Sequence, residues 1–440
     1  MRIIYFFLLS MIFHGVIAQN VTIPDANFKA YLVGNPAINI NGDTEIQLSE
    51  AVEYTGDISC PNLNISSLVG IEAFINIEQL NCKNNNLTAL NLTQNTALQV
   101  LIAQGNQISN LSLNTVNSQL WYIDVGINQL TSFQPGNHPL LETLVIFLNQ
   151  LTNLDVSQNA LLESLHCANN LLTSLNLDNN PLLYTLLCNH NQITSLSLTQ
   201  NPALIFLDCY NNQITNLNVS QNTLLEKLRC NNNPLSGLNV TQNNLLTRLV
   251  CSNNTLTSLN VSQNTLLDEL HCGLNMITSL DLTQNTNLTK LVCNFNDLNF
   301  LNVKNTNNLN VITFSAVSNP NLSCIIVDDA AYSTANWTSI DSGTVFSETL
   351  AGCSLSVESF TSEIDCNVYP NPSDTQFTIA YDREIDSIQL FNVFGQKVIE
   401  TKNKTIQVEN IKPGIYFLKV YSEERILTKK IMIKPQAYEN

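Results

Sequence analysis

LESLHCANNLLTSLNLDNNPL (residues 162–182) is followed at once by LYTLLCNHNQITSLSLTQNPA (183–203) and LIFLDCYNNQITNLNVSQNTL (204–224). A period of 21 residues therefore governs this part of the chain. Self-similarity at such a period is the sequence signature of a repeat architecture, in which each unit stacks on the next. One unit of this length has too few leucines to bury them alone, so stacking must supply the continuous core.

Aligning the chain on the cysteine predicts thirteen rungs, spaced by 21 residues except for two steps of 22. The consensus of a rung is L-x-x-L-x-C-x-x-N-x-L-T-x-L-x-L-x-x-N-x-x. Leu162, Leu165 and Cys167 alternate inward, as in a strand, and the later T-x-L-x-L segment predicts a second extended stretch on the opposite side. The column residues of the thirteen rungs are Cys60, Cys82, Ala103, Val125, Ile146, Cys167, Cys188, Cys209, Cys230, Cys251, Cys272, Cys293 and Phe314.

An asparagine stands three residues after the cysteine column in eleven successive rungs, including Asn170, Asn191 and Asn212. Its amide has two donors and an acceptor, so a stacked row of them can satisfy the backbone groups that are freed where each strand turns. A second asparagine column, from Asn95 to Asn285, marks the return turn.

These columns closely resemble the leucine-rich repeat family. The cysteine in the strand and the 21-residue length are similar to the internalin subgroup, in particular its internalin J-like members, over residues 55–318. The resemblance implies a mainly β fold: a solenoid with a parallel sheet and a helical N-terminal cap.

The evenly spaced cysteines are interpreted as core packing. Zinc needs ligands that converge on one centre, whereas these thiols lie on a line. Disulfides between neighbouring rungs are disfavoured, because the strand spacing of about 4.8 Å exceeds the usual Cβ separation of a disulfide. The same column accepts Ala103, Val125, Ile146 and Phe314, so it is an apolar slot in which cysteine acts as a small hydrophobe. No metal and no cofactor are expected.

The N-terminal segment reads as a secretory signal peptide, residues 1–18, with Arg2, an apolar run and a small-residue cleavage site near Ala18. No later run is long enough to span a membrane, so we expect no transmembrane span. Residues 19–54 predict a helical cap with Asp25 as an N-cap. Four side chains in this cap partly fit an EF-hand loop, which makes a structural cap the favoured interpretation and calcium the alternative: Asn39, Asn41, Asp43 and Glu50.

Residues 319–353 predict a C-terminal cap, in which Tyr332, Trp337 and Phe346 cover the leucines of the last rung. A disulfide between Cys324 and Cys353 is the favoured pairing, and Cys366 is the competing partner.

Residues 354–366 read as a polar linker, and the remainder, residues 367–440, shows short alternating strands that predict a small antiparallel β-sandwich. The motifs YPNP (369–372), LFNVFGQKV (390–398), PGIY (413–416) and KKIMIK (429–434) resemble the type A C-terminal sorting domain of the type IX secretion system. That resemblance implies contact with the type IX secretion machinery, a secreted protein, and the outer-membrane surface or exterior of a Gram-negative bacterium. The alternative from the residues alone is an immunoglobulin-like adhesion domain.

Charge excludes some partners. Residues 1–366 hold 8 Lys and Arg against 26 Asp and Glu, and residues 367–440 hold 10 against 9. An acidic body without a basic stripe argues against nucleic acid. The five histidines lie in no triad or metal-binding motif, so no catalytic residue is assigned and an enzyme is not expected.

Outward positions of the strands vary from rung to rung, and they include exposed aromatic residues and arginines of the kind found in binding hot spots. We therefore predict a binding protein whose concave sheet recognises an extracellular protein or glycan, in adhesion or in contact with a host or substrate. The alternatives are a structural surface or matrix protein and, less favoured, an accessory of a hydrolase. The predicted ligand-binding residues are Tyr122, Asp124, Phe147, His166, Phe206, Asp208, Tyr210, Arg229, Arg248, Glu269 and His271.

Overall fold

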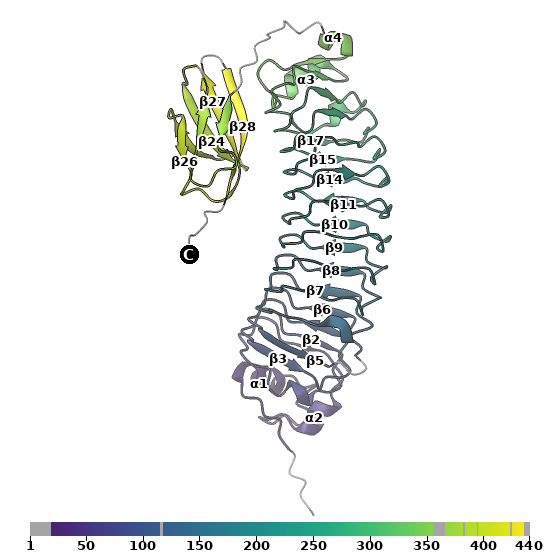
Figure 1. The fold of residues 1–440 in the computed structure, drawn as a ribbon. Helices are drawn as coiled ribbons and strands as arrows, with labels where there is room; N and C mark the ends of the chain where they lie inside the picture. Colours follow the sequence, from purple (N-terminus) through teal and green to yellow (C-terminus); the bar gives the residue numbers. More distant parts are fainter. Residues whose placement is uncertain are drawn as a thin grey trace, which may run out of the picture.

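The computed structural model describes residues 19–114, 118–354, 366–381, 383–393, 395–422 and 425–434. The predicted signal peptide and most of the predicted linker lie outside these ranges. The described chain forms an elongated stack of rungs with helices at both ends and a separate small β-module (Figure 1).

The N-terminal end of the stack is covered by two short helices, α1 (Ala26–Val33) and α2 (Leu48–Glu53). Asp25 caps α1 as predicted, since its carboxylate accepts hydrogen bonds from the backbone N–H groups of Asn27 and Phe28 at 3.0 Å. Phe28 and Leu32 point from α1 into the core.

Thirteen parallel strands form one continuous sheet along the stack, as the rung count predicts. Each strand pairs in register with the next, so that Leu186, Leu207 and Leu228 stack in one inward row. The strands, in order, are β1 (Ile58–Ser59), β2 (Gln79–Asn81), β4 (Val100–Ile102), β6 (Tyr122–Asp124), β7 (Thr143–Val145), β8 (Ser164–His166), β9 (Thr185–Leu187), β10 (Phe206–Asp208), β12 (Lys227–Arg229), β14 (Arg248–Val250), β15 (Glu269–His271), β17 (Lys290–Val292) and β19 (Thr313–Ser315).

The last rung differs from the prediction. Phe314 pairs with Leu291, and therefore occupies the leucine row and not the cysteine column. Two extra residues lengthen this rung, so that Ala316 follows the strand where Cys293 follows β17, and both are buried. Asn319 then continues the asparagine column, donating to the carbonyls of Cys293 and Ala316 at 3.2 and 2.8 Å.

The asparagine column has the role that its chemistry predicts. The Asn212 amide nitrogen donates to the carbonyls of Cys188 and Cys209 at 3.0 and 3.1 Å, and its oxygen accepts from the Ile193 N–H at 3.0 Å. One side chain thus satisfies three backbone groups on two rungs. In the second column, the Asn201 amide donates to the carbonyls of Leu177 and Asn180 at 3.0 and 2.8 Å.

The opposite side of the stack is less regular than the T-x-L-x-L pattern predicts. Strands form there only in some rungs of the described chain, because elsewhere the extended segments do not pair. Three 3-10 turns, η1 (Ile71–Ala73), η2 (Pro135–Asn137) and η3 (Asn308–Asn310), complete this side. The paired strands are β3 (Ala89–Leu92) with β5 (Asn110–Leu113), β11 (Leu217–Asn218) with β13 (Leu238–Asn239), and β16 (Ser279–Asp281), β18 (Phe300–Asn302), β20 (Cys324–Ile326) and β21 (Val345–Ser347) in one sheet.

The C-terminal end of the stack is closed by α3 (Ala330–Asn336), β21 and α4 (Leu350–Ser354). Trp337 stacks on Phe314 of the last rung, with ring centroids 4.2 Å apart, and Phe346 packs against both rings. A disulfide joins Cys324 to Cys353 and so ties β20 to α4. Cys366 lies instead in the core of the following module.

The C-terminal module is an antiparallel sandwich of two sheets with its own core. The short strands expected from the sequence are present. One sheet contains β22 (Asn367–Tyr369), β23 (Gln376–Ala380) and β26 (Thr405–Gln407); the other contains β25 (Lys397–Thr401), β24 (Ser387–Asn392), β27 (Gly414–Ser422) and β28 (Arg425–Ile433).

Candidate functional site: the outward face of the parallel sheet

The outward face of the thirteen-stranded sheet, called the sheet face below, is built by one rule. In β10 the central Leu207 points into the core, so that Phe206 and Asp208 on either side of it point outward. Cys209 points inward again and Tyr210 outward. Because the strands are parallel and in register, Asp208 lies beside Arg229 of β12, and Arg248 of β14 beside Glu269 of β15.

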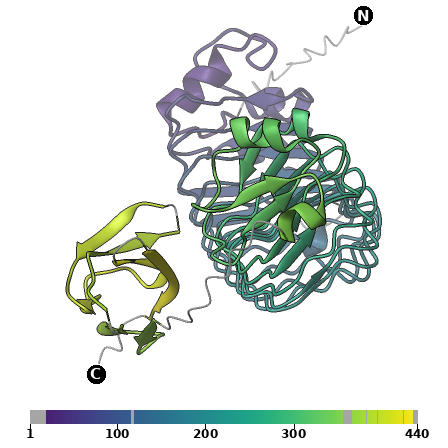
Figure 2. The same ribbon diagram turned by 90° about the horizontal axis from the view of Figure 1, so that it is seen from above.

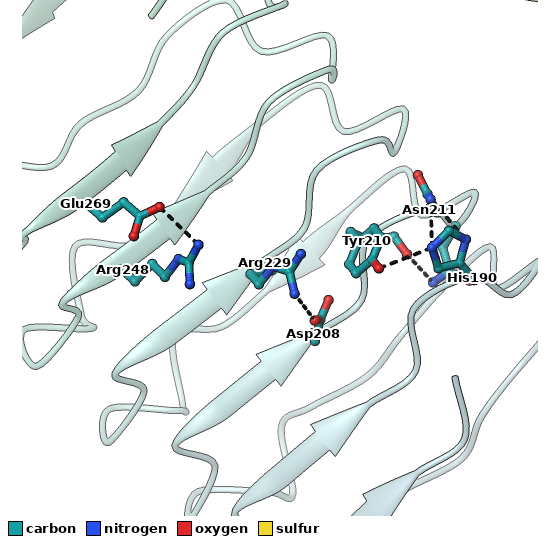
Figure 3. A network of polar contacts seen from close by, with 8 residues as sticks. His190, Asp208, Tyr210, Asn211, Arg229, Arg248 and Glu269 are labelled. Atoms are coloured by element: carbon teal, nitrogen blue, oxygen red, sulfur yellow. Dashed lines mark hydrogen bonds and ion pairs between the residues drawn. The ribbon is translucent and has the colours of Figure 1, made fainter. Parts of the chain in front are cut away.

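The structure brings three of the predicted residues, Asp208, Tyr210 and Arg229, together into one central network on neighbouring rungs (Figure 3). Arg229 Nη1 donates to Asp208 Oδ2 at 2.7 Å, and the guanidinium carbon lies 4.6 Å from the centroid of the Tyr210 ring. This pairing combines a charge-assisted hydrogen bond with a cation–π contact.

His190 extends the central network, although it was not among the predicted binding residues. Its Nε2 lies 3.2 Å from the Tyr210 hydroxyl, and its ring meets the Tyr210 ring edge-on at 4.8 Å. The amide nitrogen of Asn211 donates to the same imidazole at 3.0 Å. His190 stands two positions after the cysteine column, where each rung turns. Reading this turn position along the repeats as a column of its own would have revealed it.

Asp208 is only 4% exposed, although it faces outward. Burial raises the pKa of its carboxyl, and the adjacent Arg229 guanidinium opposes that rise. Asp208 thus faces outward, as alternation predicts, but is covered. Neighbouring side chains cover the carboxylate and leave His190, Tyr210 and Arg229 as the accessible part of the network.

A second network surrounds Glu269, which is also buried. Arg248 Nη2 donates to Glu269 Oε1 at 3.0 Å, and Lys290 Nζ lies 3.8 Å from Oε2. His271 Nε2 lies 3.1 Å from Oε1. Burial lowers the pKa of His271, and Glu269 opposes that shift in part. Lys290 also belongs to this network, although it was not among the predicted residues. It occupies the same strand position as Arg248 and Glu269, so this column would have indicated it.

The N-terminal part of the sheet face has aromatic contacts instead of ion pairs. The rings of Phe147 and His166 stack at 4.5 Å with an angle of 4° between their planes. The Phe147 ring lies over Gly126, where a Cβ atom would come within 2.5 Å of it. Burial lowers the pKa of His166, which keeps this imidazole neutral near pH 7.

The remaining predicted residues stand apart from these networks. Tyr122 meets Trp121 edge-on with ring centroids 5.8 Å apart. Asp124 is buried, accepts a hydrogen bond from the Gly126 N–H at 3.1 Å, and has a carboxyl pKa raised by burial. Phe206 is half-buried. The eleven predicted residues thus form separate groups along one face and not a single pocket.

The calcium candidate in the N-terminal cap uses its oxygens within the protein. Glu50 accepts from the backbone N–H groups of Ile40, Asn41 and Gln47 at 2.9 to 3.2 Å, and so holds the loop against α2. Asn39 Oδ1 accepts from the Gly42 N–H at 3.1 Å. These contacts are those of a structural cap. Within the described ranges, no group of three or more His, Cys, Asp or Glu side chains is placed to hold a metal ion.

The ladder cysteines are likewise enclosed. All nine, from Cys60 to Cys293, are buried in the core, and burial raises the pKa of the Cys167 and Cys272 thiols to about 12. A thiol with such a pKa stays protonated, and it is neither a nucleophile nor a metal ligand at neutral pH.

The C-terminal module matches a known family. Residues 367–434 match the family model of the secretion system C-terminal sorting domain. The fold is similar to that of leucine-rich-repeat proteins, and the sorting module indicates a secreted, cell-surface or extracellular protein. Among the described residues, none of the helices has the length and apolar character that a membrane crossing requires.

The solenoid is similar to internalins. The functional domain of InlJ from Listeria monocytogenes, a structure described as including a cysteine ladder, is 26% identical with a TM-score of 0.55, and the match covers 94% of this chain and 98% of that one. InlF from the same organism is 22% identical with a TM-score of 0.60, covering 74% and 98%. A leucine-rich-repeat protein from Leptospira interrogans is 22% identical with a TM-score of 0.50, covering 60% and 76%. The last two support the fold alone. No curated protein sequence matches the chain significantly.

Proposed function

We propose that this protein is displayed at the outer-membrane surface of a Gram-negative bacterium, or released from it, and binds an extracellular protein or glycan through the sheet face. The observation that carries the proposal is the central network, in which Tyr210 and Arg229 stand on adjacent rungs with Asp208 beneath them. Residues 367–440 would act in export, through the type IX secretion machinery.

The physical argument concerns preorganisation. Tyrosine and arginine dominate binding hot spots, because each offers a large contact area and a polar end. Here the Arg229 side chain is held by Asp208 and by the Tyr210 ring, so that less side-chain freedom is lost when a ligand docks. Asp208 has a positioning role, since it is covered and acts through Arg229.

The test is a screen of the chain from residue 19 onward against a glycan array and a panel of extracellular surface proteins. A hit is then measured with the triple variant Phe206→Ala, Tyr210→Ala, Arg229→Ala. We expect a loss of at least about a hundredfold in affinity, since each hot-spot residue contributes upwards of 1 kcal/mol. The matched control is Gln213→Ala with Asn216→Ala, because both residues are exposed and lie on the turn side of the same rung.

Unchanged binding in the triple variant would contradict the assignment of the sheet face. A chain that binds nothing and instead assembles end to end, as measured by light scattering, would favour a structural surface protein.

A further inference from the structure

Each rung of the stack turns through one residue with a left-handed backbone, two positions after the cysteine column. Its φ lies between 51° and 72° in all thirteen rungs. Asparagine and glycine tolerate this conformation, whereas a bulky apolar side chain is strained there. The thirteen corner residues are Asn62, Asn84, Gly105, Ile127, Leu148, Asn169, His190, Asn211, Asn232, Asn253, Leu274, Phe295 and Ser318.

Four corners break this rule, and they occur as two adjacent pairs: Ile127 with Leu148, and Leu274 with Phe295. Core burial does not explain them, because Ile127 and Leu148 are 44% and 46% exposed. Strain retained without burial points to an interaction outside the rung. The two pairs are therefore candidates for surfaces that contact something else.

The second pair has its contact within the same chain. The Phe295 ring packs against Phe417 of β27, with ring centroids 4.5 Å apart. Both views of the molecule show the C-terminal module beside the C-terminal part of the stack (Figures 1 and 2).

Phe417 lies outside the core of its own module. Tyr416, Leu418 and Val420 of β27 form part of the core of the sandwich, whereas Phe417, between them, points away from it. It is nevertheless only 6% exposed.

The surroundings of the two rings complete an apolar surface with one pair of opposite charges. Leu274, Met276 and Pro320 of the stack line a small pocket together with Phe295 and Phe417. Lys430 of β28, which pairs with Phe417 in the sheet, lines the same pocket beside Asp297. Apolar contact at the centre with charge at the rim is the usual composition of an interface.

We propose that the Leu274–Phe295 corner is the docking site for the outer face of β27 and β28, so that the sorting module is held against the repeat domain in the full-length chain. The corner residues accept backbone strain because the module covers them. When the module is absent, the same corner is an open apolar surface.

Hydroxyl-radical footprinting of the chain from residue 19 onward tests this proposal, because it reports the accessibility of single side chains. Phe295→Asn installs the residue that six of the thirteen corners carry, so the rung keeps its turn. We expect oxidation of Phe417 to rise several-fold in this variant, and the maximum dimension measured by small-angle X-ray scattering to increase. Leu148→Asn is the matched control: it makes the same exchange at a corner without this contact, and Phe417 should stay protected.

A second variant, Phe417→Ser, leaves the core of the sandwich intact and should raise the oxidation of the half-buried Phe295. Equal oxidation of Phe417 in the unaltered chain, in Phe295→Asn and in Leu148→Asn would overturn the proposal. So would a rise of the same size in both asparagine variants, since it would reflect a change in the whole stack.

Discussion

The inward and outward sides of the thirteen-stranded sheet are under different constraints, although the same strands form both. Inward, Leu207 of β10 lies between Leu186 of β9 and Leu228 of β12, and Cys209 follows β10 as Cys188 and Cys230 follow those strands; all are fully buried. Outward, Asp208 lies between Leu187 and Arg229. An inward slot is shaped by the rungs above and below it, and therefore takes the same side chain again. An outward position has one open side, and its contacts reflect whatever the neighbouring rungs present.

The inward side should make the protein unusually sensitive to alkali, and this is the largest effect that we predict. The thiols have an ordinary pKa of 9.0, and burial raises it to about 12 for Cys60, Cys167 and Cys272 and well above 9.0 for Cys209 and the others. The folded chain therefore binds protons more tightly than the unfolded chain. Stability is complete below about pH 8 and is lost as the pH rises from 9 toward 12.

The magnitude follows from the number of thiols. Each one removes about 1.4 kcal/mol of unfolding free energy per pH unit above its unfolded pKa. Nine thiols that unfold together remove about 13 kcal/mol per pH unit, which is comparable with the whole stability of a domain. We expect unfolding near pH 10 to 11, measured by circular dichroism. Replacing Cys188, Cys209 and Cys230 with alanine should reduce the slope of free energy against pH by about a third; an unchanged slope would show that the thiols are not responsible.

The asparagine column should give the next largest effect. Asn212→Ala leaves the Ile193 N–H without its partner inside the stack. The carbonyls of Cys188 and Cys209 each lose one of two amide donors and keep those of Asn191 and Asn233. We expect a loss of about 2 kcal/mol, because an unsatisfied buried N–H costs roughly 1 to 3 kcal/mol. Denaturation in guanidinium chloride measures it. Cys209→Ala in the same rung is the comparison, and should cost only about 1 kcal/mol for the smaller side chain. A larger loss for Cys209→Ala than for Asn212→Ala would reverse the assigned roles.

The inward side could be predicted from the sequence because it obeys a period. The rung count, the Asp25 cap, the asparagine column and the C-terminal sandwich all follow from spacing and residue chemistry. The prediction failed at Phe314, where two inserted residues shift the column and the alignment had no further rung to correct it.

The outward side could be located but not described from the sequence. Alternation places Asp208 and Glu269 outward, yet both are covered, because long side chains of neighbouring rungs reach over them. The length of Arg229 decides this, and no period encodes it. The contact of Phe295 with Phe417 joins residues 122 positions apart in different domains, so no local pattern reveals it.

The smallest predicted effect concerns the ion pairs of the sheet face. It distinguishes a pair with a covered carboxylate from a pair whose arginine is more exposed. Arg229→Ala leaves the covered Asp208 carboxylate unpaired, and we expect a loss of about 1 to 2 kcal/mol at pH 7, between the values for exposed and buried pairs. Arg248→Ala, whose side chain is more exposed, should cost about 0.5 kcal/mol.

Burial already raises the pKa of Asp208, and removing Arg229 raises it further, so the carboxyl takes up a proton as the pH falls. The deficit of Arg229→Ala should therefore shrink between pH 7 and pH 4, and Asp208→Asn in the same chain should remove most of it. Urea denaturation at both pH values measures the difference. A deficit that is independent of pH and survives Asp208→Asn would mean that Arg229 acts through packing on Tyr210 and not through the charge beneath it.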